Sequence, residues 1–484
     1  MPACTSDGGS TNTLSENLFA RGTVPPEWDR SVTRPASESV ASQSRSTCAF
    51  HKGAMPAETI GADLPVDADI PIKNIVVLMQ ENRSFDSYFG HLGKYAHRTD
   101  IESAPDGATN PENVKDPNSP LHAWTHAKTL CLSDTNHEWD GAHLEYDNGK
   151  MDGFFQANQG FTEAGEPAVG PDLTTGDRAL WWYDERDIPF YYELANTFAI
   201  GDHYHSALLG PTYPNRDYLY AATSRGLTIN VQPDLTDLQF PAHDAVIFDE
   251  LERRHISWTV FIDSTSPGVG VFLGNQLVTR WSGIHFEPRL SFTLRSRLGT
   301  LPQVSFVDAD LKHENVDGND EHPPSDIQIG QKFVSDVVHD VFKSPQWKDI
   351  AMFIAYDEHG GIYDHVPPPP ACPPDDLAPK LTTLANMSYP GAFDRLGVRV
   401  PVIVVSPYTK RNYVSHHVYD HTSITRFIEA KFKLPALTNR DANADAMFDF
   451  FDFSHREFET PPTIADAQID AARKAECEAL YPAN

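Results

Sequence analysis

Residues 75–90 read IVVLMQENRSFDSYFG, in which five apolar residues lead straight into Gln-Glu-Asn-Arg-Ser with no turn residue between them. A uniformly apolar run of this length, rich in Val, is typical of a strand buried on both faces of a sheet. Glu81 and Asn82 therefore stand at the carboxyl end of a buried strand. A carboxylate and an amide are unusual at the end of a buried strand, and other parts of the sequence indicate what they could bind.

The same pattern recurs, because four more apolar runs end in polar residues: SWTVFIDS (257–264), PQVSFVDAD (302–310), IAMFIAYDEHGG (350–361) and VPVIVVSPY (400–408). Helical patterns alternate with these runs. One repeats apolar residues every four positions from Phe333 to Val341 behind a cap at Ser325, and two others fall in 243–256 and 421–432. This alternation predicts an α/β sandwich with a mostly parallel central sheet and helices on both faces.

Strand ends also indicate where a ligand binds, since open α/β sheets bind ligands outside the carboxyl ends of their strands. Glu81 and Asn82 lie at one such end, and Asp357 and Glu358 lie at another. Three carboxylates and an amide oxygen that converge would hold one divalent cation, such as Ca²⁺, Mg²⁺ or Mn²⁺. The alternative is that each pair only caps the backbone of its own strand.

A candidate nucleophile lies in GPTYPNR (210–216), where Gly-Pro forces a turn and a helical run follows Asn215. Thr212 precedes that helix, so its hydroxyl would face backbone N–H groups and the positive end of the helix dipole. Such a position favours an attacking alkoxide and a bound phosphate. From this motif alone a simple helix cap is the better explanation of Thr212, since Thr is a common cap and a rare nucleophile.

Several histidines lie among acidic residues in predicted loops: His137, His322, His359 and His365. Nearby carboxylates favour the cationic imidazolium, which can neutralise a phosphoryl oxygen or protonate a leaving group. Each one taken singly can also be read as a solvated surface residue.

Charge excludes one class of partner. The chain has 484 residues with 38 basic against 68 acidic side chains, a net charge of −30. We therefore expect no nucleic-acid partner, and an anionic ligand would need a local positive site such as a metal ion or a group of histidines. The five cysteines are odd in number and widely scattered, which predicts neither a disulfide framework nor a zinc site: Cys4, Cys48, Cys131, Cys372 and Cys477.

Three segments are expected. Residues 1–68, rich in Ser, Thr, Pro and Gly, predict a flexible N-terminal tether or surface wrap, residues 69–457 the catalytic domain, and residues 458–484 a tail with one weak helix over 464–480. Long loops over 86–127 and 366–399 are expected to form lids or rims of a site.

Taken together, QENRSFDSYFG, GPTYPNR, DEHPPSD and YDEHGGIYDHVPPP resemble one family in type, order and spacing. It is the phosphoesterase family of non-specific phospholipases C and AcpA-type acid phosphatases, and the resemblance runs from about residue 72 to 435. It implies an alkaline-phosphatase-like fold with one metal centre. By motif, the implied metal ligands are Glu81, Asn82, Asp357 and Glu358, the implied nucleophile is Thr212, and the implied phosphate-binding histidines are His137 and His322. It also implies positions around these for Asp320, His359, His365 and His421.

The resemblance implies a metal-dependent phosphoric ester hydrolase of the phospholipase C type that acts through a phosphothreonine intermediate on a phospholipid or a small phosphate ester. An acid phosphatase acting on monoesters is the alternative within the same chemistry, and an inactive surface protein that binds lipid headgroups is the alternative of another class. Peripheral membrane contact is part of this expectation.

The family also implies an extracytoplasmic location, secreted, periplasmic or lipid-tethered, although no signal peptide is visible. ACTSDGGS (3–10) is similar to the start of a mature lipoprotein, or is an ordinary N-terminal stretch. The sequence leaves open the metal, the headgroup, the oligomeric state and the lipidation of Cys4.

Overall fold

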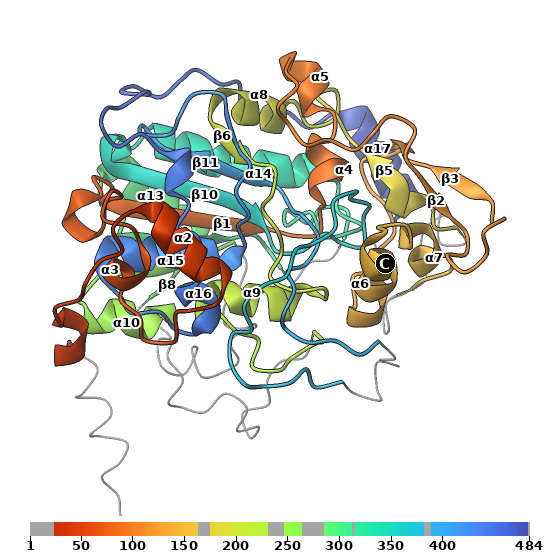
Figure 1. The fold of residues 1–484 in the computed structure, drawn as a ribbon. Coiled ribbons are helices and arrows are strands. Elements are labelled where there is room, and N and C mark those ends of the chain that lie inside the picture. Colours follow the sequence, from red (N-terminus) through yellow and green to blue (C-terminus); the bar gives the residue numbers. More distant parts are fainter. Residues whose placement is uncertain are drawn as a thin grey trace, which may run out of the picture.

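The computed structural model describes residues 24–162, 175–230, 246–263, 285–311, 315–381 and 389–482. An eight-stranded sheet runs through the centre of the molecule (Figure 1). Its strands lie in the order β12 (Tyr413–Ser415), β6 (Ala199–Gly201), β11 (Val402–Val405), β10 (Ile350–Tyr356), β1 (Asn74–Gln80), β9 (Val304–Asp308), β7 (Trp258–Ile262) and β8 (Phe286–Pro288). Only β11 runs antiparallel to its neighbours, so the predicted mostly parallel sheet is confirmed.

Helices cover both faces of the sheet, as the alternating pattern predicts. On one face α9 packs against α10 and α15, and on the other α14 packs against α8 and α13 (Figure 1). The α-helices are α2 (Glu38–Ser46), α3 (Pro56–Thr59), α4 (Phe85–Phe89), α5 (Leu92–Ala96), α6 (Trp139–Tyr146), α7 (Phe154–Asn158), α8 (Pro189–Thr197), α9 (Thr212–Ala221), α10 (Ile247–Arg253), α13 (Arg289–Leu298), α14 (Ile327–Phe342), α15 (His421–Phe432), α16 (Asn439–Ala442) and α17 (Ala471–Leu480). Short 3-10 helices occur at η2 (Pro26–Asp29), η3 (Asp67–Asp69), η4 (Asp147–Gly149), η5 (Asp177–Leu180), η6 (Trp347–Asp349) and η8 (Phe448–Phe450).

The apolar stripe of α14 explains why this helix forms where the periodicity places it. Phe333, Val337 and Val341 are all buried against the sheet. Its N-cap is Asp326, one residue later than the predicted Ser325, because the Asp326 carboxylate accepts a hydrogen bond from the backbone N–H of Gln328 at 2.9 Å. The Ser325 hydroxyl donates instead to the carbonyl of Asn315.

A second, smaller hydrophobic core lies beyond the carboxyl ends of the strands. It includes Trp124, Phe154, Leu180 and Tyr363. The predicted loop over 86–127 is therefore not one open loop, because it contains α4, α5 and the short strands β2 (Thr109–Pro111), β3 (Leu121–Ala123) and β4 (Thr125–His126). Strand β4 pairs with β5 (Trp181–Trp182), which ties this lobe together.

Two disulfides correct the expectation drawn from the cysteines. Cys48 is bonded to Cys372 and Cys131 to Cys477, across 324 and 346 residues of sequence. Their spacing gave no signal because each partner lies hundreds of residues from the other and only the fold brings them together. Cys4 lies outside the described residues.

The same bridges correct the picture of the two ends. From residue 24 onward the N-terminal segment forms η2, α2 and α3 and packs on the domain. Residues 24–68 are therefore a surface wrap and not a flexible tether. Its chain is fixed by the bond to Cys372 and by a hydrogen bond from Gly53 N to the carbonyl of Ala436. At the other end, the predicted helix begins at Ala471 rather than at residue 464, and Cys477 anchors it.

Candidate active site

The register of the sheet brings the two predicted ligand pairs together. β1 and β10 are parallel neighbours, with Gln80 opposite Tyr356. The next residues on each strand, Glu81 and Asp357, therefore leave the sheet side by side. The backbone N–H of Asn82 donates to Oδ1 of Asp357 at 3.2 Å, which joins the two strand ends directly.

Arg216, which no sequence pattern had indicated, lies between these strand ends. Its guanidinium is 3.1 Å from Oε1 of Glu81 and 2.9 Å from Oδ2 of Asp357, and the side chain is completely buried. Burial opposes a charge here, yet the carboxylates of Asp357 and Glu81 raise the pKa of Arg216 above its usual value. Two of the four predicted ligands are therefore neutralised by a buried arginine.

Thr212 is placed over the same strand ends by α9. It is the first residue of that helix, so Arg216 lies one turn further along on the same face. The N-cap of α9 is Pro211, and no side chain caps the helix. The view of Thr212 as only a cap therefore finds no support in the geometry, and its buried hydroxyl stands at the positive end of the helix.

His137 and His322 approach the site from two different loops. Their ring centroids are 5.7 Å apart, and Nδ1 of His137 lies 3.4 Å from the side-chain amide nitrogen of Asn82. In each ring Nδ1 donates to a backbone carbonyl, that of Thr135 at 2.8 Å or that of Pro323 at 2.7 Å. These bonds set the tautomer, so proton exchange with a substrate falls to Nε2.

Three buried oxygens at this place have no hydrogen-bond partner among the described residues. They are Oδ1 of Asn82, Oε1 of Glu358 and Oδ2 of Asp320. A buried acceptor without a partner is costly, so a bound ion or an ordered water is expected at each of these oxygens. Hard oxygen atoms are the ligands that Ca²⁺, Mg²⁺ and Mn²⁺ prefer, so this donor set fits a divalent cation.

The carboxylates of the site differ in pKa. Burial raises the pKa of Asp357 to about 6 and that of Asp320 to about 6. Burial also raises the pKa of Glu81 well above its usual value. Glu358 behaves differently, because His137 and His359 outweigh its burial and lower its pKa. Glu358, beside the imidazole of His137, therefore keeps its negative charge to a lower pH than Asp357 or Asp320 does.

Other groups in the structure are also compatible with a metal ion. Asp134, His137 and His322 have ligand atoms within 4.8 Å of one another and are all buried. Two further groups of the same kind lie elsewhere in the described part of the chain: Asp86, Asp364 and His365, and His126, Asp184 and Asp187.

Glu321, which no sequence pattern had indicated, lies between the site residues Asp320 and His322. Its carboxylate accepts hydrogen bonds from the hydroxyls of Tyr88 at 2.5 Å, Tyr191 at 2.5 Å and Tyr356 at 2.9 Å. Its backbone has a φ of 74°, and a side chain on Gly330 would overlap its Cγ. The residue between Asp320 and His322 is thus held in a left-handed conformation by three tyrosines.

The remaining predicted residues, His421, His359 and His365, make different contacts around the site. His421 donates from Nε2 to the carbonyl of Asp357 at 2.6 Å, and burial lowers its pKa to about 4. His359 contacts Glu145 at 2.7 Å, and although burial opposes its charge, Glu145 and Glu358 raise its pKa to about 9. His365 is not part of this site.

His365 belongs to a second buried cluster, centred on Arg399. The Arg399 guanidinium binds Asp364 at 2.9 Å and Asp86 at 3.1 Å. His365 completes the cluster through Nδ1, which lies 2.6 Å from Oδ2 of Asp86. Every carboxylate oxygen of Asp86 and Asp364 accepts hydrogen bonds.

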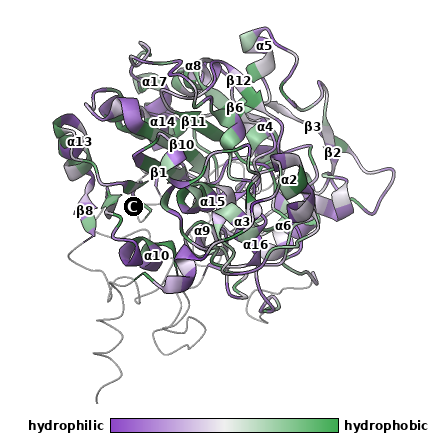
Figure 2. Ribbon diagram, turned by 60° about the vertical axis from the view of Figure 1, so that its left-hand side comes forward, coloured by the Kyte–Doolittle hydropathy of each residue, from purple (hydrophilic) through white to green (hydrophobic). Residues whose placement is uncertain are grey.

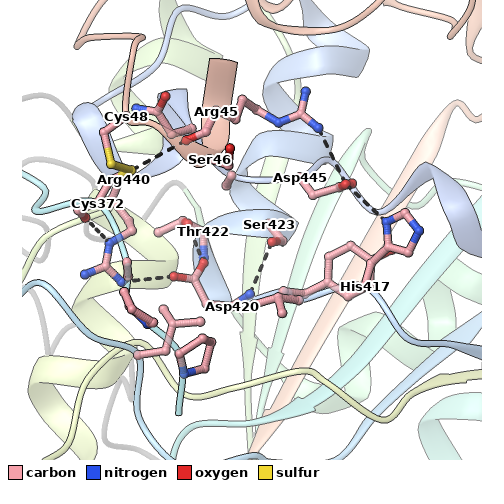
Figure 3. Close-up of a pocket in the computed structure, with 18 of the residues that line it drawn as sticks. Arg45, Ser46, Cys48, Cys372, His417, Asp420, Thr422, Ser423, Arg440 and Asp445 are labelled. Atoms are coloured by element: carbon pink, nitrogen blue, oxygen red, sulfur yellow. Dashed lines mark hydrogen bonds and ion pairs between the residues drawn. A yellow bond between two sulfur atoms is a disulfide. The ribbon is translucent and has the colours of Figure 1, made fainter. Parts of the chain in front are cut away.

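A cavity of about 500 Å³ lies away from these groups, beside the Cys48–Cys372 bridge (Figure 3). Arg440 lines it and is already bonded to Asp420 and to the carbonyl of Cys372, as the dashed lines in Figure 3 show. The charged groups of this cavity bind one another, since Arg440 is paired with Asp420, and Arg45 and His417 are paired with Asp445.

Comparisons with a known family and with its members agree on one class. The Phosphoesterase family matches residues 72–435. Non-specific phospholipase C1 of Arabidopsis thaliana is 34% identical over 401 residues, which cover 79% of this chain and 71% of that protein. Phospholipase C B of Mycobacterium tuberculosis is 29% identical over 453 residues, covering 83% of this chain and 82% of the relative. Among solved structures, murine ectonucleotide pyrophosphatase / phosphodiesterase 5 aligns with a TM-score of 0.36 and 11% identity over 55% of this chain and 95% of its own.

Proposed function

Because the chain belongs to the Phosphoesterase family and is a phosphoric ester hydrolase, we propose that it is a metal-dependent phospholipase C that acts through a phosphothreonine at Thr212. The observation that carries the proposal is the position of α9. Its first residue is Thr212, and its Arg216 is bound to both strand ends beside three buried, unbonded oxygens. A nucleophile and a donor set for a cation are thereby held on one rigid frame.

Each side chain then has a defined role. The Thr212 oxygen attacks phosphorus while one histidine of the His137–His322 pair accepts its proton. The bond from phosphorus to the diacylglycerol oxygen breaks, and the other histidine, in its protonated form, donates a proton to that oxygen. Water then attacks the phosphothreonine and gives a proton to the histidine that was left neutral, while the Thr212 oxygen leaves and takes back the proton held by the other histidine, which releases the phosphorylated headgroup.

The backbone and the acidic residues hold the reacting groups in place. Asn82, Glu358 and Asp320 would hold the cation, with Glu81 and Asp357 behind them and joined to Arg216. When bound, a divalent cation supplies positive charge to the phosphate oxygens and lowers the pKa of the attacking hydroxyl. At the start of α9 the N–H of Tyr213 donates to Oδ1 of Asn230 and Pro214 has no N–H, so the N–H of Thr212 is the one proposed to bind a phosphate oxygen.

A substrate panel tests the proposal against its alternatives. The purified protein is assayed on phosphatidylcholine, with release of phosphocholine and diacylglycerol measured, and on a phosphate monoester, with inorganic phosphate measured. Faster turnover of the diester supports the phospholipase C. Faster turnover of the monoester favours an acid phosphatase instead, and binding of headgroups without turnover of either favours the inactive binding protein. Thr212→Ala is the control for contaminating activity.

We also propose an extracytoplasmic location. The two disulfides support it, because such bonds form and persist in oxidising compartments. Fractionation of the native host tests this directly. Recovery of the whole pool in the cytosol, with both cysteine pairs reduced, would contradict it.

A further inference from the structure

Helix α13 exposes a line of leucines. Leu290, Leu294 and Leu298 recur every four residues, so they share one face of the helix, and they are 67%, 53% and 73% exposed. The opposite face packs inward through Phe292 and Ser296, which are buried. Figure 2 shows α13 at the margin of the molecule, beside β8. An exposed apolar stripe on the surface of a folded domain generally marks a place where something binds.

The charges of α13 differ from those of the whole chain. The helix contains Arg289, Arg295 and Arg297 and no acidic residue, whereas the protein carries a net charge of −30. Arg289 is paired with Asp340 and Arg295 with Glu287. Arg297 is 59% exposed, and its nearest carboxylate oxygen, Oδ1 of Asp340, lies 3.8 Å away. The cavity beside the helix is lined by the basic Lys332 and Lys343 and also by the acidic Asp263, Asp336 and Asp466. Leucines on one face with arginines at its border are typical of helices that lie in a membrane surface.

The location of α13 connects this face to the active site. The four strands from β8 through β7 and β9 to β1 are successive parallel neighbours, so their carboxyl ends lie at one edge of the sheet. Helix α13 follows β8 directly and therefore begins at the edge where Glu81 and Asn82 leave β1. A cavity of about 540 Å³ at this edge is lined by Leu290, Arg297 and Asn319. Asn319 is the residue before Asp320, so the start of α13, with Leu290, lies beside the candidate site, and the helix runs from there toward the opposite edge of the sheet, where β9 begins.

We propose that the Leu290–Leu294–Leu298 face of α13 inserts into the surface of a phospholipid bilayer and brings the active-site edge of the sheet to its lipid substrate. This rests on the proposed phospholipase function. No helix in the described ranges is long and apolar enough to cross a membrane, and the proposed contact is peripheral. A second copy of the chain is a poorer occupant, because a stable dimer buries about 800 Å² on each partner, more than three leucine side chains expose.

The experiment separates binding from catalysis. Vesicles of phosphatidylcholine with phosphatidylglycerol are sedimented with the wild type, with the triple variant Leu290→Gln, Leu294→Gln, Leu298→Gln, and with Leu121→Gln. Leu121 is a matched control because it is equally exposed, at 67%, but lies on β3. We expect the triple variant to lose at least tenfold in vesicle partitioning and Leu121→Gln to lose less than twofold. We expect Arg297→Gln to weaken binding only to vesicles that contain the anionic lipid.

A soluble, short-chain phosphatidylcholine below its micelle concentration gives the second measurement. The triple variant should hydrolyse it at the wild-type rate while losing activity on vesicles. Equal vesicle partitioning of the triple variant and the wild type would overturn the inference. So would a triple variant that melts far below the wild type, or one that changes from dimer to monomer in light scattering. If no variant hydrolyses the soluble substrate, the proposed function fails, and the sedimentation result still decides the membrane contact.

Discussion

Two buried arginines in this molecule are each held between two carboxylates, one carboxylate from the segment that follows β1 and one from the segment that follows β10. Arg216 lies between Glu81 and Asp357, and Arg399 lies between Asp86 and Asp364. Around Arg399, all four carboxylate oxygens accept hydrogen bonds. Around Arg216, oxygens of Asn82, Glu358 and Asp320 have none within the described part of the chain.

The difference separates a structural cluster from a functional one. A fully bonded buried ion cluster gains nothing further from a ligand and mainly fixes the chain segments that contribute to it. A buried cluster with unbonded oxygens is costly until something binds it. We therefore interpret the Arg399 cluster as a brace for the chain after β1 and β10, and the Arg216 cluster as the site.

The largest expected effect is that of Thr212→Ala, which should lower turnover by about a thousandfold or more, as deletions of nucleophiles do. The free energy of unfolding should change by less than about 1 kcal/mol, because the Thr212 hydroxyl does not cap α9. Steady-state kinetics and urea unfolding measure the two effects. Thr212→Ser should keep part of the activity. A Thr212→Ala variant that retained most of its turnover, with no phosphothreonine trapped by acid quench, would remove the covalent mechanism.

Arg399→Met should have the opposite profile. Asp86 and Asp364 would be left buried without their counter-charge, so we expect a loss of about 3–5 kcal/mol in the free energy of unfolding. The turnover number of the folded fraction should change by less than about threefold. Urea unfolding followed by active-site titration tests this. A variant of unchanged stability and lost activity would show that the Arg399 cluster takes part in catalysis.

Glu358→Gln should remove metal-dependent stabilisation while Asp364→Asn should leave it intact. At a metal concentration of about 100 Kd, binding stabilises the native state by about 2.7 kcal/mol. We expect this increment in the wild type and in Asp364→Asn, measured as the shift of the melting temperature on adding Ca²⁺, Mg²⁺ or Mn²⁺ after chelation. Elemental analysis of each protein is the second readout. An unchanged shift in Glu358→Gln would contradict its assignment as a ligand.

The smallest effect concerns His365 and pH. Burial opposes its charge, but the hydrogen bond to Asp86 raises its pKa above the usual value. A raised pKa contributes stability that is complete below the unfolded value of about 6.5 and is lost as the pH rises through the folded value. The difference in unfolding free energy between wild type and His365→Gln should therefore be greatest near pH 5.5, on the order of 1 kcal/mol, and decline above pH 6.5. A difference that grew with pH would mean that His365 is neutral in the folded protein.

Much of the fold followed from local pattern. Apolar runs such as 75–79 and 350–356 can only be buried strands, and parallel pairing then makes Glu81 and Asp357 neighbours. This is why the predicted pairs lie together. Gly210-Pro211 likewise indicated a helix close to Thr212, although α9 begins at Thr212 itself and not after Asn215 as predicted.

The rest depended on contacts between distant segments, which no local pattern contains. Arg216 reads as an ordinary helix residue until β1 and β10 place carboxylates on both sides of it. Glu321 lies inside the DEHPPSD motif, but its partners Tyr88, Tyr191 and Tyr356 come from three other segments. His365 resembled His359 in its acidic surroundings, and only the fold assigned it to a different arginine. The roles of Thr212, His137, His322 and the metal ligands remain predictions.

The two disulfides give the chain an unusual connectivity. The ring closed by Cys48 and Cys372 overlaps the ring closed by Cys131 and Cys477, so every peptide bond from residue 48 to residue 477 lies inside at least one covalent loop. A single cut by a protease anywhere in that range leaves both pieces attached to each other. Nicked protein should migrate as one species on a non-reducing gel and as two after reduction. Damage to a surface segment would thus leave the strand ends that hold the site within one molecule.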